Sequence, residues 1–271
     1  MKDLSRSFPT WFCDIWGVVH DGISPFPKSV ATLAKHRDNG GCVILVTNSP
    51  NTSPSVTKHL DQIGVAREAY DAVVTSGDVT RDLITKFGGG KIYHIGTPRD
   101  YSIFEGLETT RVALNDAKSV VCSGLFDENT ETADDYLPLL TEIKQLGLTM
   151  ICANPDKVVR KGSQLIPCAG ALAEVYADIG GKVLMAGKPY LPIYELAKVT
   201  AERIIGKPVG KSQILAIGDG PATDIKGAAD FGVPCVLITG GINTSDNITD
   251  EVKNAVPHAQ ILRSMVELDW T

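Results

Sequence analysis

Short apolar runs alternate with longer amphipathic segments along most of the chain. The runs WFCDI at 11–15 and GCVILVTN at 41–48 are typical of strands buried on both faces. Between them, residues 27–39 carry apolar residues at helical spacing and end at two glycines. Residues 53–64 show a second helical pattern, and the segment 71–78 begins as a strand and leads into a helix start at 76–78. This alternation predicts βαβ units, and therefore a mainly parallel sheet with helices on both faces.

A second α/β block begins after the glycine-rich break at 87–91 and ends at the glycine pair 180–181. Its predicted strands are 91–96, 119–124 and 148–154, with an amphipathic helix at 132–146. The first pattern then resumes, with predicted strands at 182–189, 213–220 and 234–239 and predicted helices at 191–205 and 222–231. A self-contained block between two glycine breaks indicates a domain inserted into a discontinuous one.

Composition narrows the possible classes of protein. A length of 271 residues fits one large domain or two moderate ones, and a net charge of −6 gives no electrostatic reason to expect a nucleic-acid partner. None of the six cysteines forms a CxxC pair, which favours reduced core thiols in a cytoplasmic protein. No apolar run approaches the roughly 20 residues that cross a bilayer, and no signal peptide is evident, so we expect no membrane partner.

Polar residues follow several of the predicted strands, at the edge where a parallel sheet binds its ligands. A single aspartate in such a place is usually a turn or capping residue, but several suitable residues at several strand ends favour a site. The residues in question are Asp14, Thr47, Asn48, Lys188, Asp219 and Asp224.

This set of residues suits phosphoryl transfer. Lys188, Thr47 and Asn48 supply the positive charge and hydrogen-bond donors that a phosphate dianion requires. Asp14 and Asp219 offer oxygen ligands to a hard cation such as Mg²⁺, which offsets the repulsion between a carboxylate nucleophile and an anionic phosphate. An aspartate then attacks phosphorus and forms an aspartyl-phosphate.

Four short motifs in this order resemble those of the haloacid dehalogenase (HAD) superfamily of phosphotransferases. They are DIWGV at 14–18, LVTNSP at 45–50, GKP at 187–189 and IGDGPATDI at 217–225. Further segments at 73–78, 153–156 and 167–172 are similar to the class IIA branch, which contains the NagD-like and p-nitrophenylphosphatase-like proteins.

The resemblance implies an α/β fold with a Rossmann-like parallel-sheet core at 1–87 and 183–271 and an inserted α/β cap domain at 88–182. It implies a Mg²⁺-dependent phosphatase, a hydrolase that acts on a small phosphorylated metabolite such as a sugar phosphate, with a homodimer as one possible assembly. By this analogy Asp14 is the nucleophile. The implied metal ligands are Asp14, the backbone carbonyl of Trp16, Asp219 and Asp224, and the implied phosphate-binding residues are Thr47, Asn48 and Lys188.

Trp16 is the one departure from these motifs that affects the chemistry. The family's phosphatases carry a second aspartate at this position, which protonates the leaving alcohol and then activates water. An indole N–H only donates hydrogen bonds and does neither. Three alternatives stay open: a phosphatase for good leaving groups or with a substitute acid such as His20 or Asp21, a phosphotransferase with slow hydrolysis, and a non-catalytic protein that binds a phosphorylated metabolite.

One further segment, the polar and glycine-led stretch 240–251, is predicted to be an ordinary surface loop, and the alternative is that it edges the active site.

Overall fold

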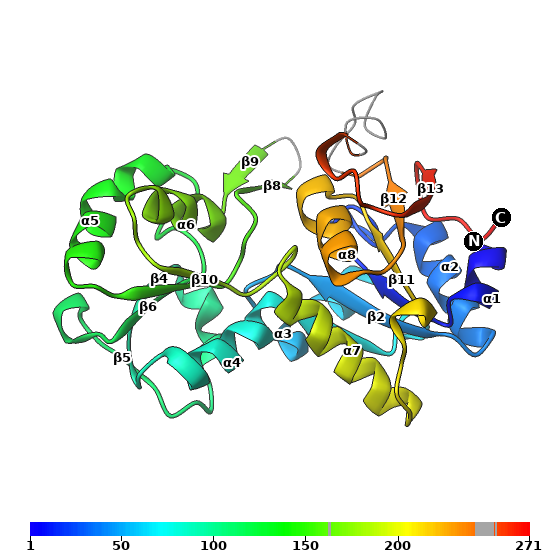
Figure 1. Cartoon of the computed structure of the whole chain (residues 1–271), viewed down its shortest axis with the longest axis horizontal. Coiled ribbons are helices and arrows are strands. Elements are labelled where there is room, and N and C mark those ends of the chain that lie inside the picture. The colour runs from blue at the N-terminus through cyan, green and yellow to red at the C-terminus, as the bar shows by residue number, and fades with distance from the viewer. Residues whose placement is uncertain (162–163, 242–251, 253) are drawn as a thin grey trace. The chain divides into compact units, whose positions relative to one another are not determined.

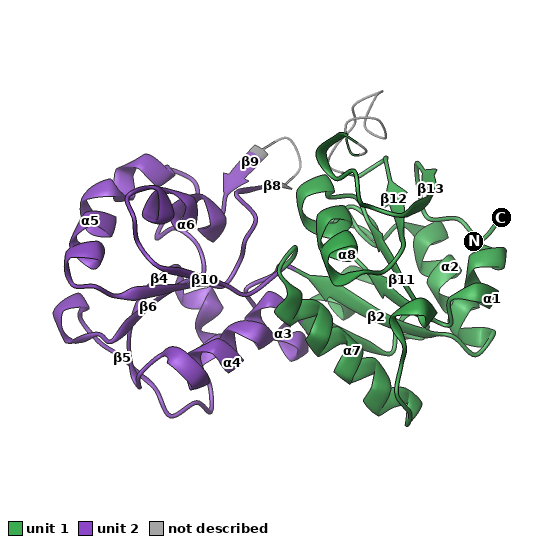
Figure 2. Ribbon diagram, in the orientation of Figure 1, with its two compact units in different colours: residues 1–47, 56–74, 188–271 green, residues 48–55, 75–187 purple. Residues whose placement is uncertain are grey.

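The computed structural model describes all residues except 162–163, 242–251 and 253. By its internal contacts the chain divides into two compact units, coloured separately in Figure 2. Unit 1 consists of residues 1–47, 56–74 and 188–271, and unit 2 of residues 48–55 and 75–187. Most of the segment predicted as the surface loop, 242–251, lies outside the described residues.

Unit 1 is built on a six-stranded sheet with the strand order β13-β12-β11-β1-β2-β3 (Figure 1). The strands are β1 (Thr10–Cys13), β2 (Cys42–Thr47), β3 (Ala72–Thr75, whose last residue belongs to unit 2), β11 (Ile214–Gly218), β12 (Cys235–Ile238) and β13 (Ile261–Met265). The central strand β1 pairs in parallel with both β2 and β11. All four of its residues are buried, as the apolar run that begins at Trp11 predicts, and the burial extends to the polar Thr10.

The helices of unit 1 begin and end at residues that favour those positions. They are α1 (Lys2–Ser7), α2 (Pro27–Asp38), the part of α3 (Ser53–Ile63) from residue 56 on, α7 (Leu191–Ile205) and α8 (Lys226–Phe231). Pro27 opens α2, where its missing N–H is not needed. Gly206 closes α7 in the left-handed conformation, with a φ of 77°. One apolar cluster of the unit packs helix and strand residues together, Trp11 and Leu45 among them.

Unit 2 contains a five-stranded parallel sheet of its own, in the order β10-β7-β6-β4-β5. Its strands are β4 (Lys91–Ile95), β5 (Thr110–Arg111), β6 (Ser119–Cys122), β7 (Thr149–Cys152) and β10 (Val183–Met185), beside an antiparallel pair, β8 (Val158–Lys161) and β9 (Gln164–Pro167). Its helices are α4 (Ser76–Phe87), α5 (Leu137–Gln145), α6 (Ala169–Asp178) and a 3₁₀ helix, η2 (Pro98–Phe104). Thr75 and Asp78 form a reciprocal capping box at the start of α4.

Sequence and structure agree on the fold class, an α/β protein with parallel sheets. The helix predicted at 132–146 begins instead as a 3₁₀ turn at Ala133–Tyr136, and only Leu137–Gln145 is α-helical. The helix predicted at 222–231 opens with a π-helical turn, Pro221–Ile225, before α8. The sequence reading assigned no strand to β13, to β5 or to the β8–β9 pair.

The predicted cap, 88–182, lies within unit 2, which also takes in α4 and extends to Gly187. The domain boundaries themselves stay a prediction. All six cysteines are free and buried. No helix among the described residues is long and apolar enough to cross a membrane.

Candidate active site

The register of two neighbouring strands brings Asp14 and Asp219 to one edge of the unit 1 sheet. Asp14 directly follows β1, and Asp219 directly follows β11. Cys13 pairs with Ile217, and the backbone N–H of Asp14 donates to the carbonyl of Ile217 over 2.8 Å. Carboxyl ends of parallel strands meet at one edge, so the two carboxylates lie side by side as predicted.

A third carboxylate, Asp224, joins them from the π-helical turn after β11. One oxygen each of Asp14, Asp219 and Asp224 lies within 4.8 Å of the others, and all three residues are buried. We call these three residues with Lys188 the carboxylate cluster. The backbone N–H of Gly220 donates to Oδ2 of Asp224 over 3.0 Å, which fixes that carboxylate in its turn.

Lys188 is the cation of the cluster, and it is 4% exposed. Its Nζ lies 2.5 Å from Oδ1 of Asp14 and 2.7 Å from Oδ1 of Asp224. Burial alone lowers the pKa of Lys188, but Asp14 and Asp224 raise it well above its usual value, so the lysine stays charged. Burial raises the pKa of Asp14, and the charge of Asp224 raises it further, while Lys188 opposes both effects.

Glycines hold the backbone close to these carboxylates. Gly17 has a φ of 82°, and a Cβ there would lie 2.3 Å from Oδ2 of Asp219. A Cβ on Gly241 would lie 2.0 Å from the same oxygen, and one on Gly218 would lie 2.3 Å from Cβ of Asp224. Such separations are far below van der Waals contact, so only glycine fits at these positions. The sequence analysis did not single out these three glycines individually, although Gly17 and Gly218 lie inside motifs and Gly241 lies in the glycine-led stretch 240–251.

The donor set of the cluster fits a hard divalent cation. The three buried carboxylates bring oxygens within 4.8 Å of one another, and Lys188 bonds two of them, Asp14 and Asp224. Oxygen ligands of this kind are those that Mg²⁺ prefers, and a cation among them opposes the burial and repulsion that raise the pKa of Asp14. Asp14, Asp219 and Asp224 are therefore the side chains that would hold it.

The two predicted phosphate ligands at the end of β2 occupy different units. Thr47 is buried and is the last residue of β2. Cys13 pairs with Leu45, so Thr47 lies at the same carboxyl edge as Asp14. Asn48 belongs to unit 2, where its side-chain amide donates to Oδ1 of Asp156 over 2.9 Å.

Trp16 and His20 form a packed pair beyond β1. Their rings meet edge to face with centroids 5.4 Å apart, and the Trp16 ring covers Gly22, where a Cβ would lie 2.4 Å from Cη2. His20 is 3% exposed, and its Nδ1 accepts a hydrogen bond from the N–H of Gly22. Burial lowers the pKa of His20 to about 4. At neutral pH the ring is therefore uncharged, with its proton on Nε2.

Neither residue suggested as a substitute acid–base has the properties of one. Neutral His20 has its only basic nitrogen occupied by Gly22, so it has no free position from which to accept a proton. Asp21 is exposed, and its Oδ1 accepts from the N–H groups of Ile23 and Ser24. These backbone bonds lower the pKa of Asp21, so it is a turn residue that is ionised at neutral pH.

Tyr194 is a neighbour of the cluster that the sequence analysis missed. It lies in α7, is 2% exposed, and its hydroxyl donates to the backbone carbonyl of Asp224 over 3.3 Å. The same hydroxyl would lie 2.3 Å from a Cβ on Gly227. Its place six residues after Lys188, in the first turn of a helix, is the only signal that the sequence offers.

Two family models match the chain. One, described as haloacid dehalogenase-like hydrolase, covers residues 11–110, and the other, described as HAD-hydrolase-like, covers residues 185–268. The two matches contain all the residues of the carboxylate cluster.

Solved structures and curated proteins agree with these matches. A haloacid dehalogenase-like hydrolase from Brucella suis is 46% identical, with a TM-score of 0.91 over 99% of this chain and 98% of that one. The acid sugar phosphatase of Staphylococcus aureus is 27% identical over 267 residues, 93% of each chain. The 4-nitrophenylphosphatase of Thermotoga maritima shares the fold, with a TM-score of 0.71 and 24% identity over 91% of this chain and 92% of that one.

Proposed function

The chain belongs to the haloacid dehalogenase-like hydrolases, and we propose that it is a phosphatase that hydrolyses small phosphate monoesters through Asp14. One observation carries the proposal: Asp14, Asp219 and Asp224 meet within 4.8 Å, and Lys188 bonds two of them. The names of relatives, an acid sugar phosphatase among them, support a small phosphorylated substrate such as a sugar phosphate.

In this proposal Asp14 is the nucleophile. Its carboxylate attacks phosphorus and forms an acyl phosphate, while the bond to the leaving alcohol breaks and the alcohol departs with the electron pair. Water then attacks the acyl phosphate, which releases inorganic phosphate and restores the carboxylate. Lys188 stays charged because two carboxylates raise its pKa, and it offers positive charge to the phosphoryl oxygens.

Asp14, Asp219 and Asp224 would hold Mg²⁺, with the backbone carbonyl of Trp16 as a further proposed ligand. When bound, the cation supplies positive charge that offsets the repulsion between the nucleophile and the phosphate. Thr47 and Asn48 are the proposed donors to the phosphoryl group. We also propose that residues 1–87 and 183–271 form the core domain and residues 88–182 the cap. The six free thiols support a reducing, cytoplasmic setting.

Trp16 sets the expected choice of leaving group. No acid stands at this position, and His20 and Asp21 do not supply one. Esters whose leaving group needs no protonation, such as p-nitrophenyl phosphate and acetyl phosphate, should therefore react much faster than alkyl phosphates. General acid–base catalysis is worth roughly 10²–10⁴-fold, and a Trp16→Asp variant should recover part of that factor on alkyl phosphates.

The test is Mg²⁺-dependent phosphate release from p-nitrophenyl phosphate by the wild-type chain and by Asp14→Asn. The variant keeps the size of the side chain but removes the nucleophile, so turnover should fall by about 10⁴-fold or more. Asp21→Asn is the matched control, since it changes an exposed turn aspartate in the same segment. Unchanged release by Asp14→Asn would rule out Asp14 as the nucleophile.

Slow hydrolysis of the acyl phosphate is a second candidate, and Trp16 is the observation that favours it. Without a base to activate water, the phosphorylated protein should persist and pass its phosphoryl group to another acceptor. Intact mass after brief exposure to acetyl phosphate separates the alternatives. A stable phosphoryl adduct that is absent in Asp14→Asn indicates a phosphotransferase. Neither adduct nor release with either ester indicates a protein that only binds a phosphorylated metabolite.

A further inference from the structure

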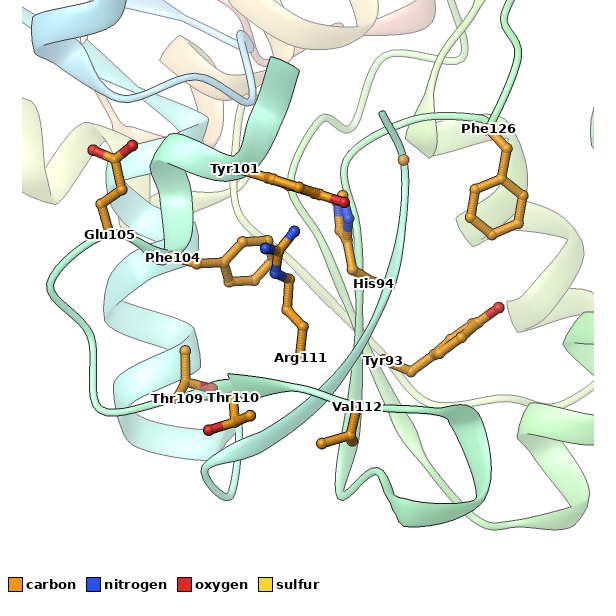
Figure 3. A pocket seen from close by; sticks show the side chains of 11 residues that line it. Tyr93, His94, Tyr101, Phe104, Glu105, Thr109, Thr110, Arg111, Val112 and Phe126 are labelled. Carbon is orange, nitrogen blue, oxygen red and sulfur yellow. The ribbon is translucent and has the colours of Figure 1, made fainter. Parts of the chain in front are cut away.

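A pocket of about 850 Å³ lies in unit 2, and residues of unit 2 alone form it (Figure 3). Its volume is that of a typical small-molecule site. Rings gather around it: Tyr93, His94, Tyr101, Phe104 and Phe126. The proposed chemistry at Asp14 uses none of these residues.

Two of these aromatic side chains are exposed to solvent. Tyr101 is 36% exposed and Phe126 is 44% exposed, although both are large side chains that folding usually covers. Exposed aromatic residues that face one pocket commonly mark a binding site.

The wall that carries Tyr101 and Phe104 is held in place from beneath. Both residues belong to η2, and the neighbouring Asp100 is 1% exposed. The hydroxyl of Ser123 donates to Oδ2 of Asp100 over 2.8 Å. Arg81 donates from one guanidinium nitrogen to the backbone carbonyls of Ser102, Ile103 and Glu105. A wall fixed in this way does not need to be ordered when a ligand binds.

The same buried bonds fix the ring of His94. The Ser123 hydroxyl donates its hydrogen bond to Asp100. In the second hydrogen bond of that hydroxyl, which joins it to Nε2 of His94 over 2.9 Å, the Ser123 oxygen is therefore the acceptor and Nε2 is the donor. Burial lowers the pKa of His94 to about 4, and the nearby charge of Arg111 adds to this effect. His94 is thus neutral, and its Nδ1 is an acceptor. Its ring meets Tyr101 and Phe104 edge to face, with centroids 5.6 and 5.1 Å away.

Arg111 is a positively charged residue in the lining of this pocket. Its guanidinium carbon lies 3.3 Å from the centre of the Tyr101 ring and 5.6 Å from that of Phe104. Stacking uses the face of a guanidinium and leaves the N–H groups at its edge available. In the described part of the chain, no carboxylate forms an ion pair with Arg111. Figure 3 shows the carboxylate of Glu105 on the far side of Phe104, directed away from the guanidinium.

We propose that this pocket binds a small molecule that joins a planar aromatic ring to a phosphate or carboxylate group. The N–H groups at the edge of the Arg111 guanidinium donate hydrogen bonds to the anion, a pairing for which the planar guanidinium is suited. The ring packs against the exposed rings of the pocket. An N–H on a heteroaromatic ring, as in a nucleotide base, finds an acceptor in Nδ1 of His94. This is a second site, distinct in its residues from the carboxylate cluster.

Calorimetric titration of the full chain carrying Asp14→Asn, with EDTA present, tests the proposal. The substitution removes the proposed nucleophile and EDTA removes Mg²⁺, so no probe is hydrolysed during the titration. The probes are AMP, which has both a ring and an anion, adenosine, which has the ring alone, and ribose 5-phosphate, which has the anion alone. 1-Naphthoate replaces phosphate by carboxylate and shows which anion the site prefers. AMP or 1-naphthoate should bind roughly tenfold or more tightly than adenosine or ribose 5-phosphate.

Substitutions in the same background locate the site. Arg111→Gln should weaken the binding of the preferred probe roughly ten- to a hundredfold, because it removes a charge-assisted pair. Tyr101→Ala should weaken it as well, and Arg111→Lys should restore only part of the loss. Arg203→Gln, which removes an exposed arginine of α7 outside the pocket, should change nothing.

Three results would overturn the proposal. They are that neither AMP nor 1-naphthoate binds at millimolar concentration, that adenosine binds as tightly as the preferred of these two probes, and that Arg111→Gln leaves the binding intact. The phosphatase assignment does not depend on these outcomes, because release of p-nitrophenol tests it at Asp14.

Discussion

Units 1 and 2 both contain a parallel sheet, yet the residues that follow their strands differ in kind. In unit 1, β1 and β11 are followed by the buried acids Asp14 and Asp219. In unit 2, β4 is followed by Gly96 and β6 by Ser123, which are both neutral. The same architecture therefore carries acids after two neighbouring strands in one unit and neutral residues after two neighbouring strands in the other.

The difference separates what a fold supplies from what its residues supply. A parallel sheet brings the ends of its strands together, whatever their side chains. Charge at that edge must then be balanced inside the protein, as Lys188 does between Asp14 and Asp224. Unit 2 buries Asp100 beside the Ser123 hydroxyl and 3.6 Å from Nε of the exposed Arg99, and it places Arg111, which stacks on Tyr101, at an exposed position.

Lysine substitutions give the largest expected contrast. Lys188→Met leaves the buried carboxylates uncompensated, and we expect it to cost about 3–5 kcal/mol of the free energy of unfolding. In unit 2, Lys157 pairs with Glu174 at the surface, where the two side chains are 62% and 49% exposed. Lys157→Met should cost at most about 1 kcal/mol. Urea denaturation of both variants measures the two losses.

A double variant shows whether uncompensated charge causes the loss. Adding Asp14→Asn to Lys188→Met removes one of the stranded carboxylates, so part of the lost stability should return. Equal losses in the two lysine variants, or no recovery in the double variant, would mean that the buried cluster is not held by charge balance.

Glycine substitutions give the next contrast. Gly17→Ala places a Cβ 2.3 Å from the Asp219 carboxylate, which must move. A displacement of about 1 Å at a catalytic site costs roughly a hundredfold in rate. Turnover of p-nitrophenyl phosphate and the rise in melting temperature with added Mg²⁺ should both fall.

The matched control in unit 2 is Gly147→Ala. Gly147 also has a positive φ, 67°, but nothing lies within 4 Å of its Cβ position. Both variants carry a backbone cost of about 1–2 kcal/mol, and only Gly17→Ala should affect turnover and the response to Mg²⁺. A similar fall in both would assign the effect to backbone strain alone.

Acid pH should reveal a property that the units share. Burial lowers the pKa of His36 in unit 1 and of His94 in unit 2 to about 4, from an ordinary value of 6.5. Between these two pH values the unfolded chain binds more protons than the folded one, so stability falls as the pH drops from 6.5 towards 4. Each histidine should account for about 2 kcal/mol of that loss.

Urea denaturation between about pH 4.5 and 7 measures the slope. His36→Gln and His94→Gln should each flatten it, since glutamine does not titrate. His258→Gln is the control, because that ring is exposed and beside Asp230. A slope that neither buried variant changes would place the acid sensitivity elsewhere.

The sequence predicted what depends on local pattern. The helix at Leu191–Ile205 has the predicted bounds, and the strands that carry the candidate site were found from their unbroken apolar runs. Lys188, Asp219 and Asp224 lie beside Asp14, as their places at strand ends suggested. Their catalytic roles stay predictions.

What the sequence did not indicate depends on contacts between distant or irregular segments. The hydrogen bond from Asn48 to Asp156 joins residues 108 positions apart, and the sequence around neither residue predicts that the other is its partner. The stacking of Arg111 on Tyr101 joins a two-residue strand to a 3₁₀ helix, two elements too short to produce a periodic signal. The fixed tautomer of His20 depends on the turn at Gly22.

The pairing of β1 with β11 also determines the order in which the ribosome supplies the parts of the molecule. Strand β1 (Thr10–Cys13) is made early, but its partner β11 (Ile214–Gly218) emerges only after all of unit 2 has been synthesised. A nascent chain that ends at Gly187 contains every residue of unit 2, whereas its β1 still lacks one neighbour. Such a chain carries Asp14 without Lys188, Asp219 or Asp224. Translation therefore delivers Asp14, the proposed nucleophile, before the residues that surround its carboxylate.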